Sequence, residues 1–560
     1  MLTFATDHSF KKMENFNVII FALAILISLS AIADKLRLSY PILLILAGML
    51  IGFIPHLPRL VLDPDIIFLV FLPPLLYETA SHTSWHDFKS NLRPISALGI
   101  SLVFFTVTAV AIAAHLFIPM LGWPLAFLLG AIVSPPDATA AVGVIKGIRL
   151  NKRVVSILEG ESLVNDASAL IAYRYALIAG ITGNFVLWRA GLEFLLIAGG
   201  GIVVGLLVGY LLAVVHKKIN DRPILATSLT LLTPFVAFLL GELVHASGIL
   251  SVVSAGLFLS RHSPEIFAFR TRTHTRIVWD TLIFLLNGFI FILIGLQLPV
   301  ILGQLTSYHL STLIGYGLVI SLVTILVRIL WVFGGAWSFH IFHKWDKKGI
   351  PLQTADNPDA TWKNVLVVAW TGTRGMISMA AALALPLTLN NGKLFPERHL
   401  IIFVCFVVIF VTLVVQGLSL PLLVRLLAIT PSDNQDKEEK KLQLHIVRST
   451  MHFLDDGGKA KLQGRVRAAL KEEYARLAGR LENEIARHTH NEEGREQFPV
   501  RAVTEMQNAQ IEIGLFQRKL LLQIHKDGNV SNDVLRQVEK EMDIDELKFS
   551  QLLPREPEQG

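Results

Sequence analysis

The stretch Glu159-Gly-Glu-Ser-Leu-Val-Asn-Asp166 puts three carboxylates and an asparagine at the start of an apolar segment that continues through residues 167–179. A charged side chain at bilayer depth costs roughly 2.5–3.5 kcal/mol on insertion scales, so each one must be compensated or used. Ser162 and Asp166 lie four positions apart and would share one face of a helix, while Glu161 and Asn165 would share the neighbouring face. Hydroxyl, amide and carboxylate oxygens are hard ligands that suit a small cation such as Na⁺, whereas zinc or copper would favour sulfur or imidazole.

The composition around this stretch is that of a membrane protein. The chain has 560 residues, of which 53% are hydrophobic and 17% are charged, against about 45–50% and 25% in soluble domains. Nearly all long apolar runs lie before residue 430, so we expect a transmembrane domain over 1–430 and a cytoplasmic tail over 431–560. The single cysteine, Cys405, excludes an intramolecular disulfide and lies in an apolar run, where it would be a small buried hydrophobe.

The apolar runs predict an all-α membrane protein with about 13 transmembrane helices between residues 16 and 427, at about 20 residues per crossing. Lysine and arginine are concentrated in alternate loops, as in Lys146, Arg149, Lys152 and Arg153. Because basic loops stay inside, this bias places the N-terminus outside and the C-terminus in the cytoplasm of a multi-pass protein of the cell (inner) membrane.

Amphipathic spacing in the tail predicts a small helical domain. Val466–Leu481, Glu505–Ile524 and Asn532–Phe549 carry apolar residues at helical spacing, and the charge run Asp436–Lys441 is interpreted as a solvated linker. No catalytic motif is present in the tail.

A second polar interruption, Ser134-Pro-Pro-Asp137, falls in the middle of an apolar span at 124–146. Two prolines remove two backbone donors and disfavour helix at the residues before them. Irregular backbone at membrane depth is tolerated where it is buried in protein or lines a cavity, and its carbonyls can hold a cation. A simple proline kink with a satisfied Asp137 is the alternative.

A third interruption, Thr371-Gly-Thr-Arg374-Gly375, breaks the span 363–386 with two glycines. Arg374 stays charged and needs a buried anion. Glu161 and Glu78 are the candidates if Asp166 is to remain available as the exchange site. Glu78 follows Pro73-Pro74 near the end of its span, and it could equally be a solvated residue at the membrane surface.

Other polar residues lie in or near the predicted spans. Glu242, His245 and Asp280 fall near predicted helix ends, where solvation at the membrane surface is the simpler interpretation. Asn287 is interpreted as a hydrogen bond between helices. Arg328 lies mid-span, and the sequence assigns it no role.

These motifs together resemble a known family. Glu161-Ser-Leu-Val-Asn-Asp166 is similar to the signature of the first subfamily of monovalent cation:proton antiporters, the sodium/proton exchangers. Pro73-Pro74 with Glu78, Ser134-Pro-Pro-Asp137, Thr373-Arg374-Gly375 and Val415-Gln-Gly417 resemble the other family motifs, in the family's order. The resemblance covers about residues 16–427.

The resemblance implies a dimer of thirteen-helix protomers with inverted repeats. Two crossed, broken helices would lie in a core domain that slides against a dimer-forming domain in an elevator-type mechanism. It implies electroneutral exchange at one site, with Asp166 as the carboxylate that cation and proton share. Asp137, Ser162 and Glu78 would coordinate the cation or relay protons through water.

The resemblance also assigns supporting roles. Asn165 would position the site, and Glu161 would pair with Arg374. Many bacterial relatives have threonine where this chain has Pro136, a predicted site residue that lacks the hydroxyl but keeps a carbonyl. If the family's ligand is the hydroxyl, the cation preference would differ here; if it is the carbonyl, little would change.

The sequence thus predicts a secondary antiporter that exchanges Na⁺, or alternatively Li⁺ or K⁺, for H⁺ and contributes to pH homeostasis. It would be no enzyme and need no cofactor, and its partners would be the ions, the bilayer and a second copy of the chain. The net charge of +6 does not call for nucleic acid, because the basic residues lie in loops. Two alternatives remain: a cation channel, and an ion-sensing membrane protein that signals through the tail.

Overall fold

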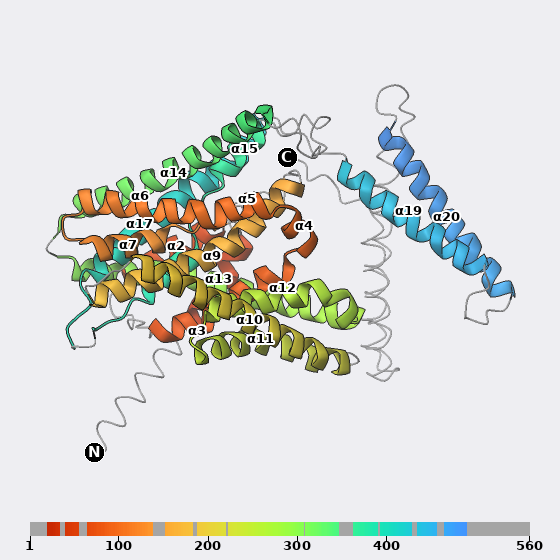
Figure 1. Ribbon diagram of the computed structural model, residues 1–560, viewed down its shortest axis with the longest axis horizontal. Helices are drawn as coiled ribbons and strands as arrows, with labels where there is room; N and C mark the ends of the chain where they lie inside the picture. Colours follow the sequence, from red (N-terminus) through yellow and green to blue (C-terminus); the bar gives the residue numbers. More distant parts are fainter. Residues whose placement is uncertain are drawn as a thin grey trace, which may run out of the picture. The chain divides into compact units, whose positions relative to one another are not determined.

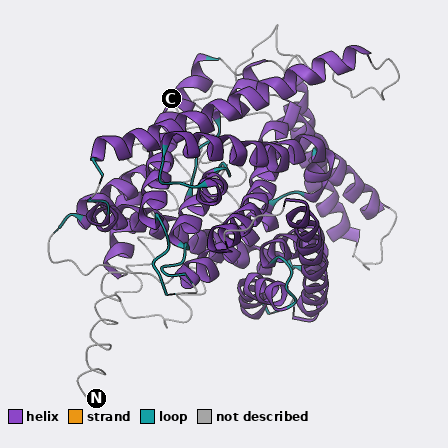
Figure 2. Ribbon diagram, turned by 60° about the vertical axis from the view of Figure 1, so that its left-hand side comes forward, coloured by secondary structure: helices purple, strands orange, loops and turns teal. Residues whose placement is uncertain are grey.

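The computed structural model describes residues 20–33, 40–54, 64–137, 152–182, 187–219, 222–306, 308–345, 362–389, 392–427, 434–455 and 464–489. These residues are helical apart from short connections and one isolated bridge between Thr388 and Leu394 (Figure 2). The chain divides into two compact units, Met1–Ser432 and Asp433–Gly560.

Six helices among the described residues are long and apolar enough to cross a membrane: Leu92–Phe117, Leu196–Ile219, Pro223–Leu243, Thr271–Gln304, Leu310–Gly335 and Arg398–Leu426. Three shorter apolar helices accompany them: Ile20–Ala33, Tyr40–Gly52 and Trp123–Val133. The chain is therefore an all-helical membrane protein, and the total of about 13 crossings stays a prediction.

The helices of the first unit form two groups by their packing. The group called here the site bundle packs α6 (Leu102–Phe117) on α7 (Trp123–Val133), α7 on α9 (Lys152–Thr182), and α14 (Leu310–Trp345) on α6 and α17 (Arg398–Thr412). It also contains the short helices α15 (Trp362–Trp370), α16 (Met376–Leu383) and α18 (Leu418–Leu426), which lie against α14, α17 and the π-turn Leu413–Gly417.

The second group is called here the flanking bundle. Its members are α2 (Tyr40–Gly52), α3 (Pro64–His82), α10 (Leu187–Ile219), α11 (Pro223–Leu243), α12 (Gly248–Ile266) and α13 (Phe269–Gln304). Here α10, α11 and α12 lie side by side, and α13 packs along α2 (Figure 1). The two bundles are in contact through α3 and α13 against α16, through α13 against α17, and through α3 and α12 against α9. Short helices α4 (Trp85–Ser90) and α5 (Leu92–Ser96), with the π-turn Ala97–Ser101, connect α3 to α6.

Small residues explain the close packing of α10 on α12. A Cβ at Gly205 would clash with the backbone of Ser251, and the Ser251 hydroxyl donates to the carbonyl of Gly201 at 3.0 Å. These glycines therefore form a packing face of α10 against α12.

Two helices of the site bundle are interrupted. Helix α7 ends at Val133, and the chain then runs without helical structure through Ser134–Asp137. Similarly, α15 ends at Trp370 and α16 begins at Met376, with non-helical backbone between them. Both breaks fall where prolines or glycines weaken the helix. Residues 138–151, which follow the first break, lie outside the described residues.

In the second unit, the described residues form two packed helices, α19 (Asn434–Asp455) and α20 (Gly464–Thr489). Val447, Ala478 and Leu481 form their buried contact, and Arg448 Nη2 lies 2.8 Å from Glu482 Oε1. The predicted helix Val466–Leu481 falls within α20, whereas the linker predicted at residues 436–441 is wrong, because this run is part of α19. Lysine and glutamate are good helix formers, so a charge run can continue a helix as well as interrupt one. The two later predicted tail helices lie outside the described residues.

Candidate cation site

One cavity gathers four of the residues predicted to form the site. Glu78 from α3, Asp137 from the first break, and Ser162 and Asp166 from α9 line about 30 Å³ of space. This volume suits one water molecule or a small cation. The other lining residues are Leu75, Thr79, Pro135, Ile283, Asn287, Gly375, Met376, Ile377 and Ser378. Elements of both bundles therefore enclose the cavity. Although three carboxylates line the cavity, no set of three His, Cys, Asp or Glu side chains among the described residues is arranged so that it could hold a metal ion by itself.

The two broken helices are joined where they cross. The backbone N–H of Asp137 donates to the carbonyl of Thr373 at 2.6 Å, and the Thr373 hydroxyl donates to the carbonyl of Asp137 at 3.0 Å. These bonds satisfy backbone groups that the missing helical turns leave open. The Asp137 carboxylate lies against Gly375, the residue that precedes α16, so it faces the positive N-terminal end of that half-helix.

Arg374 binds backbone carbonyls at or just beyond the C-terminal ends of α7 and α15. Its Nε donates to the carbonyl of Val133, the last residue of α7, at 2.9 Å, and its Nη1 donates to the carbonyl of Gly372. Its backbone N–H donates to the Thr412 hydroxyl at 3.0 Å. A buried guanidinium at a helix C-terminus is stabilised by the unpaired carbonyls and the negative end of the helix dipole.

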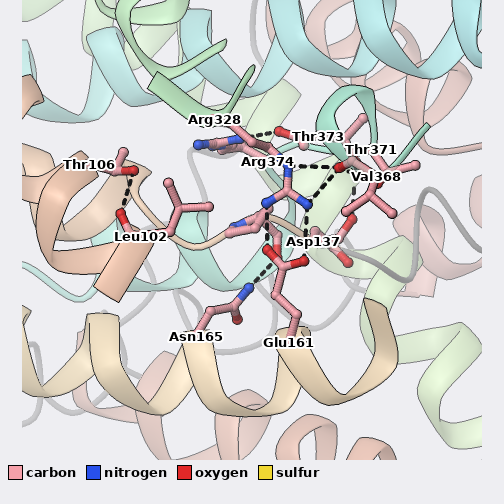
Figure 3. Close-up of polar contacts among 12 residues, drawn as sticks. Leu102, Thr106, Asp137, Glu161, Asn165, Arg328, Val368, Thr371, Thr373 and Arg374 are labelled. Atoms are coloured by element: carbon pink, nitrogen blue, oxygen red, sulfur yellow. Dashed lines mark hydrogen bonds and ion pairs between the residues drawn. The ribbon is translucent and has the colours of Figure 1, made fainter. Parts of the chain in front are cut away.

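Glu161 pairs with Arg328 of α14. Nη1 and Nη2 of Arg328 lie 2.5 and 3.0 Å from the two carboxylate oxygens, and both side chains are 2% exposed (Figure 3). Arg328 also donates from Nε and Nη2 to the carbonyl of Val368, in the last turn of α15, at 3.3 and 3.1 Å. One arginine thus ties α9 to the end of a half-helix.

The predicted ion pair between Glu161 and Arg374 is therefore wrong. The donors of Arg374 are directed at backbone carbonyls, and Arg328 meets Glu161 in a bidentate pair. The signal that could have identified Arg328 was its position in the middle of an apolar span, where a permanent charge needs a buried partner.

Asn165 and Pro136 hold the first break against α9. The Asn165 side chain, which is fully buried, donates from Nδ2 to the carbonyl of Pro136 at 3.0 Å. Neither residue lines the cavity, although both were predicted to belong to the site. The Pro136 carbonyl already accepts one hydrogen bond.

Glu78 is both partly exposed and part of the cavity lining, the two alternatives that the sequence left open. Its side chain is 22% exposed, and its Oε1 lies 3.4 Å from His82 Nδ1. It also lines the cavity, so it lies between solvent and the more deeply buried Asp166.

Comparison with known proteins identifies the family. A model of the transmembrane sodium/hydrogen exchangers matches residues 20–426. The chain belongs to the sodium/hydrogen exchanger family. This exchanger is 36% identical over 453 residues to an uncharacterized Na(+)/H(+) exchanger of Mycobacterium tuberculosis, covering 78% of this chain and 80% of the relative. It is 31% identical over 464 residues to a sodium, potassium, lithium and rubidium/H(+) antiporter of Bacillus pumilus, covering 80% and 66%.

A solved structure supports the fold of this exchanger. The sodium proton antiporter MjNhaP1 of Methanocaldococcus jannaschii superposes with a TM-score of 0.54 at 22% identity, over 74% of this chain and 98% of that structure. The resemblance stated from the sequence motifs is confirmed: this exchanger is a multi-pass membrane protein of the monovalent cation:proton antiporters, a transporter and not an enzyme.

Proposed function

We propose that this exchanger trades one Na⁺ for one H⁺ at a single site, with Asp166 as the carboxylate that both ions share. The supporting observation is how the two buried arginines are used. Arg328 binds Glu161, and Arg374 binds the carbonyls of Val133 and Gly372. Asp166, 6% exposed, is thereby left facing a cavity the size of a small cation. A bare buried carboxylate is costly, so it holds a proton or a cation in turn.

Formal charges support electroneutral exchange. Among the described residues, the buried charges of the site bundle are Arg328 and Arg374 against Glu161 and Asp166, and the half-buried Asp137 beside them at the cavity makes the sum one negative charge. One bound monovalent cation or one proton brings this sum to zero, so both loaded forms are neutral. The unloaded form carries the uncompensated charge and is the one that crosses the membrane least readily.

The division into two bundles supports an elevator-type movement. Asp137, Ser162 and Asp166 belong to the site bundle, whereas Glu78 and Asn287 face them from α3 and α13 of the flanking bundle. Sliding of the site bundle would carry the ion past these fixed residues. In this proposal the flanking bundles join two copies in a homodimer in the cell membrane. The N-terminus lies outside, and residues 431–560 form a cytoplasmic helical tail.

The proposal also concerns which cation is transported. The name of the Bacillus pumilus relative includes sodium, potassium, lithium and rubidium. Na⁺ is the substrate proposed here, with Li⁺ and K⁺ as the alternatives to be compared with it.

Exchange by purified protein in proteoliposomes tests the proposal. Vesicles with an acidic interior and a trapped pH dye receive Na⁺, Li⁺ or K⁺ outside. We expect saturable, cation-dependent loss of internal protons whose rate does not change when a membrane potential is imposed. Asp166→Asn should abolish the signal, and the exposed Asp280→Asn should not. Cation flux that does not saturate and carries no protons in return would indicate a channel. Exchange that persists after deletion of residues 433–560 would argue against an ion sensor that signals through the tail.

A further inference from the structure

Two buried oxygen atoms of uncharged residues at the cavity have no hydrogen-bond partner. They are Oδ1 of Asn287 and Oγ of Ser378, in residues that are 8% and 1% exposed. A buried polar atom left unpaired costs about 1–3 kcal/mol, and such atoms commonly mark the place of a water molecule or an ion. Because both residues line the cavity with Asp166, the partner of each oxygen is to be sought inside the cavity.

The two residues reach the cavity from helices of different bundles. Asn287 lies on α13 of the flanking bundle, and Ser378 lies on α16, the half-helix that follows the second break. The backbone carbonyl of Ser378 accepts a weak bond from Cys405 Sγ at 3.6 Å, so the residue is held in place while its hydroxyl stays available. The expected helix-to-helix hydrogen bond of Asn287 does not involve its Oδ1 atom.

Neutral oxygens have a different effect on a cation from that of carboxylates. Asp137 and Asp166 attract any monovalent cation by charge, whereas an amide or hydroxyl oxygen replaces part of the hydration shell that the ion loses. Two such oxygens on facing helices also fix the width of the site. They therefore discriminate between ions of the same charge and different radius.

We infer that Asn287 and Ser378 are further ligands of the transported cation and that their neutral oxygens set its size selectivity. The inference rests on the proposed function and adds to it the residues that choose among Na⁺, Li⁺ and K⁺. Both are ligands by direct contact. Ser378 travels with Asp166 in the site bundle, and Asn287 meets the ion from the flanking bundle.

Variants that remove one oxygen each provide the test. Asn287→Leu and Ser378→Ala leave similar shapes without the ligand atom, and Ser378→Thr keeps a hydroxyl. Ser30→Ala is the matched control, because the buried Ser30 Oγ also has no partner but Ser30 does not line the cavity. If Asn287→Leu fails to fold, Asn287→Ser gives the same comparison, because its shorter side chain withdraws the oxygen from the ion.

Transport and melting temperature are measured on the full-length protein with Na⁺, Li⁺ and K⁺. We expect the two oxygen-removing variants to raise the KM for Na⁺ about tenfold or more, the loss for one charge-assisted contact. The ratio of KM values between Na⁺ and K⁺ should change as well. Their Tm without cation should stay the same or rise, and the increase in Tm that Na⁺ produces should shrink. Ser30→Ala and Ser378→Thr should behave as the unaltered protein.

The outcomes separate the inference from the function on which it rests. If the unaltered protein exchanges Na⁺ for H⁺ while both oxygen-removing variants keep its KM, its selectivity and its Na⁺-dependent Tm, the two oxygens bind water only and the inference is wrong. A lower Tm without cation, with unchanged KM, would assign the residues a purely structural role and also overturn it. If the unaltered protein shows no exchange, the proposed function itself fails.

Discussion

The carboxylate of Asp137 occupies the space that a side chain at position 375 would need. Gly375 is the residue before α16, so the carboxylate lies at the start of that half-helix, and the same aspartate is bonded through its backbone to Thr373. Because Gly375 has no side chain, the carboxylate of Asp137 can lie at the start of α16.

Gly375→Ala should abolish exchange, because the new methyl group displaces the Asp137 carboxylate from the cavity. Misplacing a reacting or binding group by about 1 Å can cost about 10²-fold in rate. Gly315→Ala on α14 is the control: a Cβ there meets no atom within 4 Å, and alanine favours the helix. Proton release driven by Na⁺ from proteoliposomes measures both. Normal exchange by Gly375→Ala would mean that Asp137 does not contribute to the site.

The ion pair between Glu161 and Arg328 should account for a large coupling in stability. Removing one member of a buried pair costs about 3–5 kcal/mol, because the remaining charge is stranded. Arg328→Ala and Glu161→Ala should each lower the melting temperature in detergent sharply, and the double variant should recover part of the loss. The cycle is repeated with Arg374→Ala in place of Arg328→Ala. Recovery in that second cycle, and none in the first, would restore the pairing expected from the sequence.

Protons and cations should compete for one carboxylate, so the acidic limit of exchange should depend on cation concentration. For one-to-one competition, a tenfold rise in Na⁺ requires a tenfold rise in H⁺ to displace it, which moves the acidic limb about one pH unit lower. Initial rates at two Na⁺ concentrations over a pH series test this. An acidic limb that ignores Na⁺ would indicate a separate pH sensor.

A bidentate ion pair joins the two bundles away from the cavity. Arg174 Nη1 and Nη2 of α9 lie 3.1 Å from the two carboxylate oxygens of Glu242 on α11. The side chains are 51% and 35% exposed, so the pair contributes at most about 1 kcal/mol to stability. If α9 slides past α11, the pair must break, and Arg174→Gln should raise the maximal exchange rate up to about fivefold with little change in Tm.

A pair within one bundle supplies the control for that experiment. Lys217 of α10 and Glu265 of α12 lie 3.9 Å apart, are also exposed, and both belong to the flanking bundle. Lys217→Gln should leave the maximal rate unchanged. Equal rates for Arg174→Gln and the unaltered protein would argue against relative movement of α9 and α11.

Local chemistry explains which features of the site could be predicted from the sequence. Prolines at 135 and 136 and glycines at 372 and 375 weaken a helix locally, so both breaks could be predicted from the sequence. Asp137, Ser162, Asp166 and Glu78 stood out as polar residues in apolar runs, and they meet at one cavity.

Pairing between distant segments could not be predicted in this way. Which arginine meets Glu161 depends on how α14 packs against α9 and α15, and no local pattern records that packing. The unpaired oxygens of Asn287 and Ser378 likewise become informative only when their surroundings are known. The charge run at residues 436–441 could not be assigned from its composition, because that composition is compatible with both a linker and a helix.

The separation of Glu161 and Arg328 along the chain has a consequence for biosynthesis. The two residues are 167 positions apart, and a ribosome adding about 5–20 residues per second needs roughly 10–30 s to pass from one to the other. During this interval α9 has been synthesised with its carboxylates, while the arginine that neutralises Glu161 has not. Entry of α9 into the membrane is therefore the demanding step of assembly, and the arrival of α14 completes it.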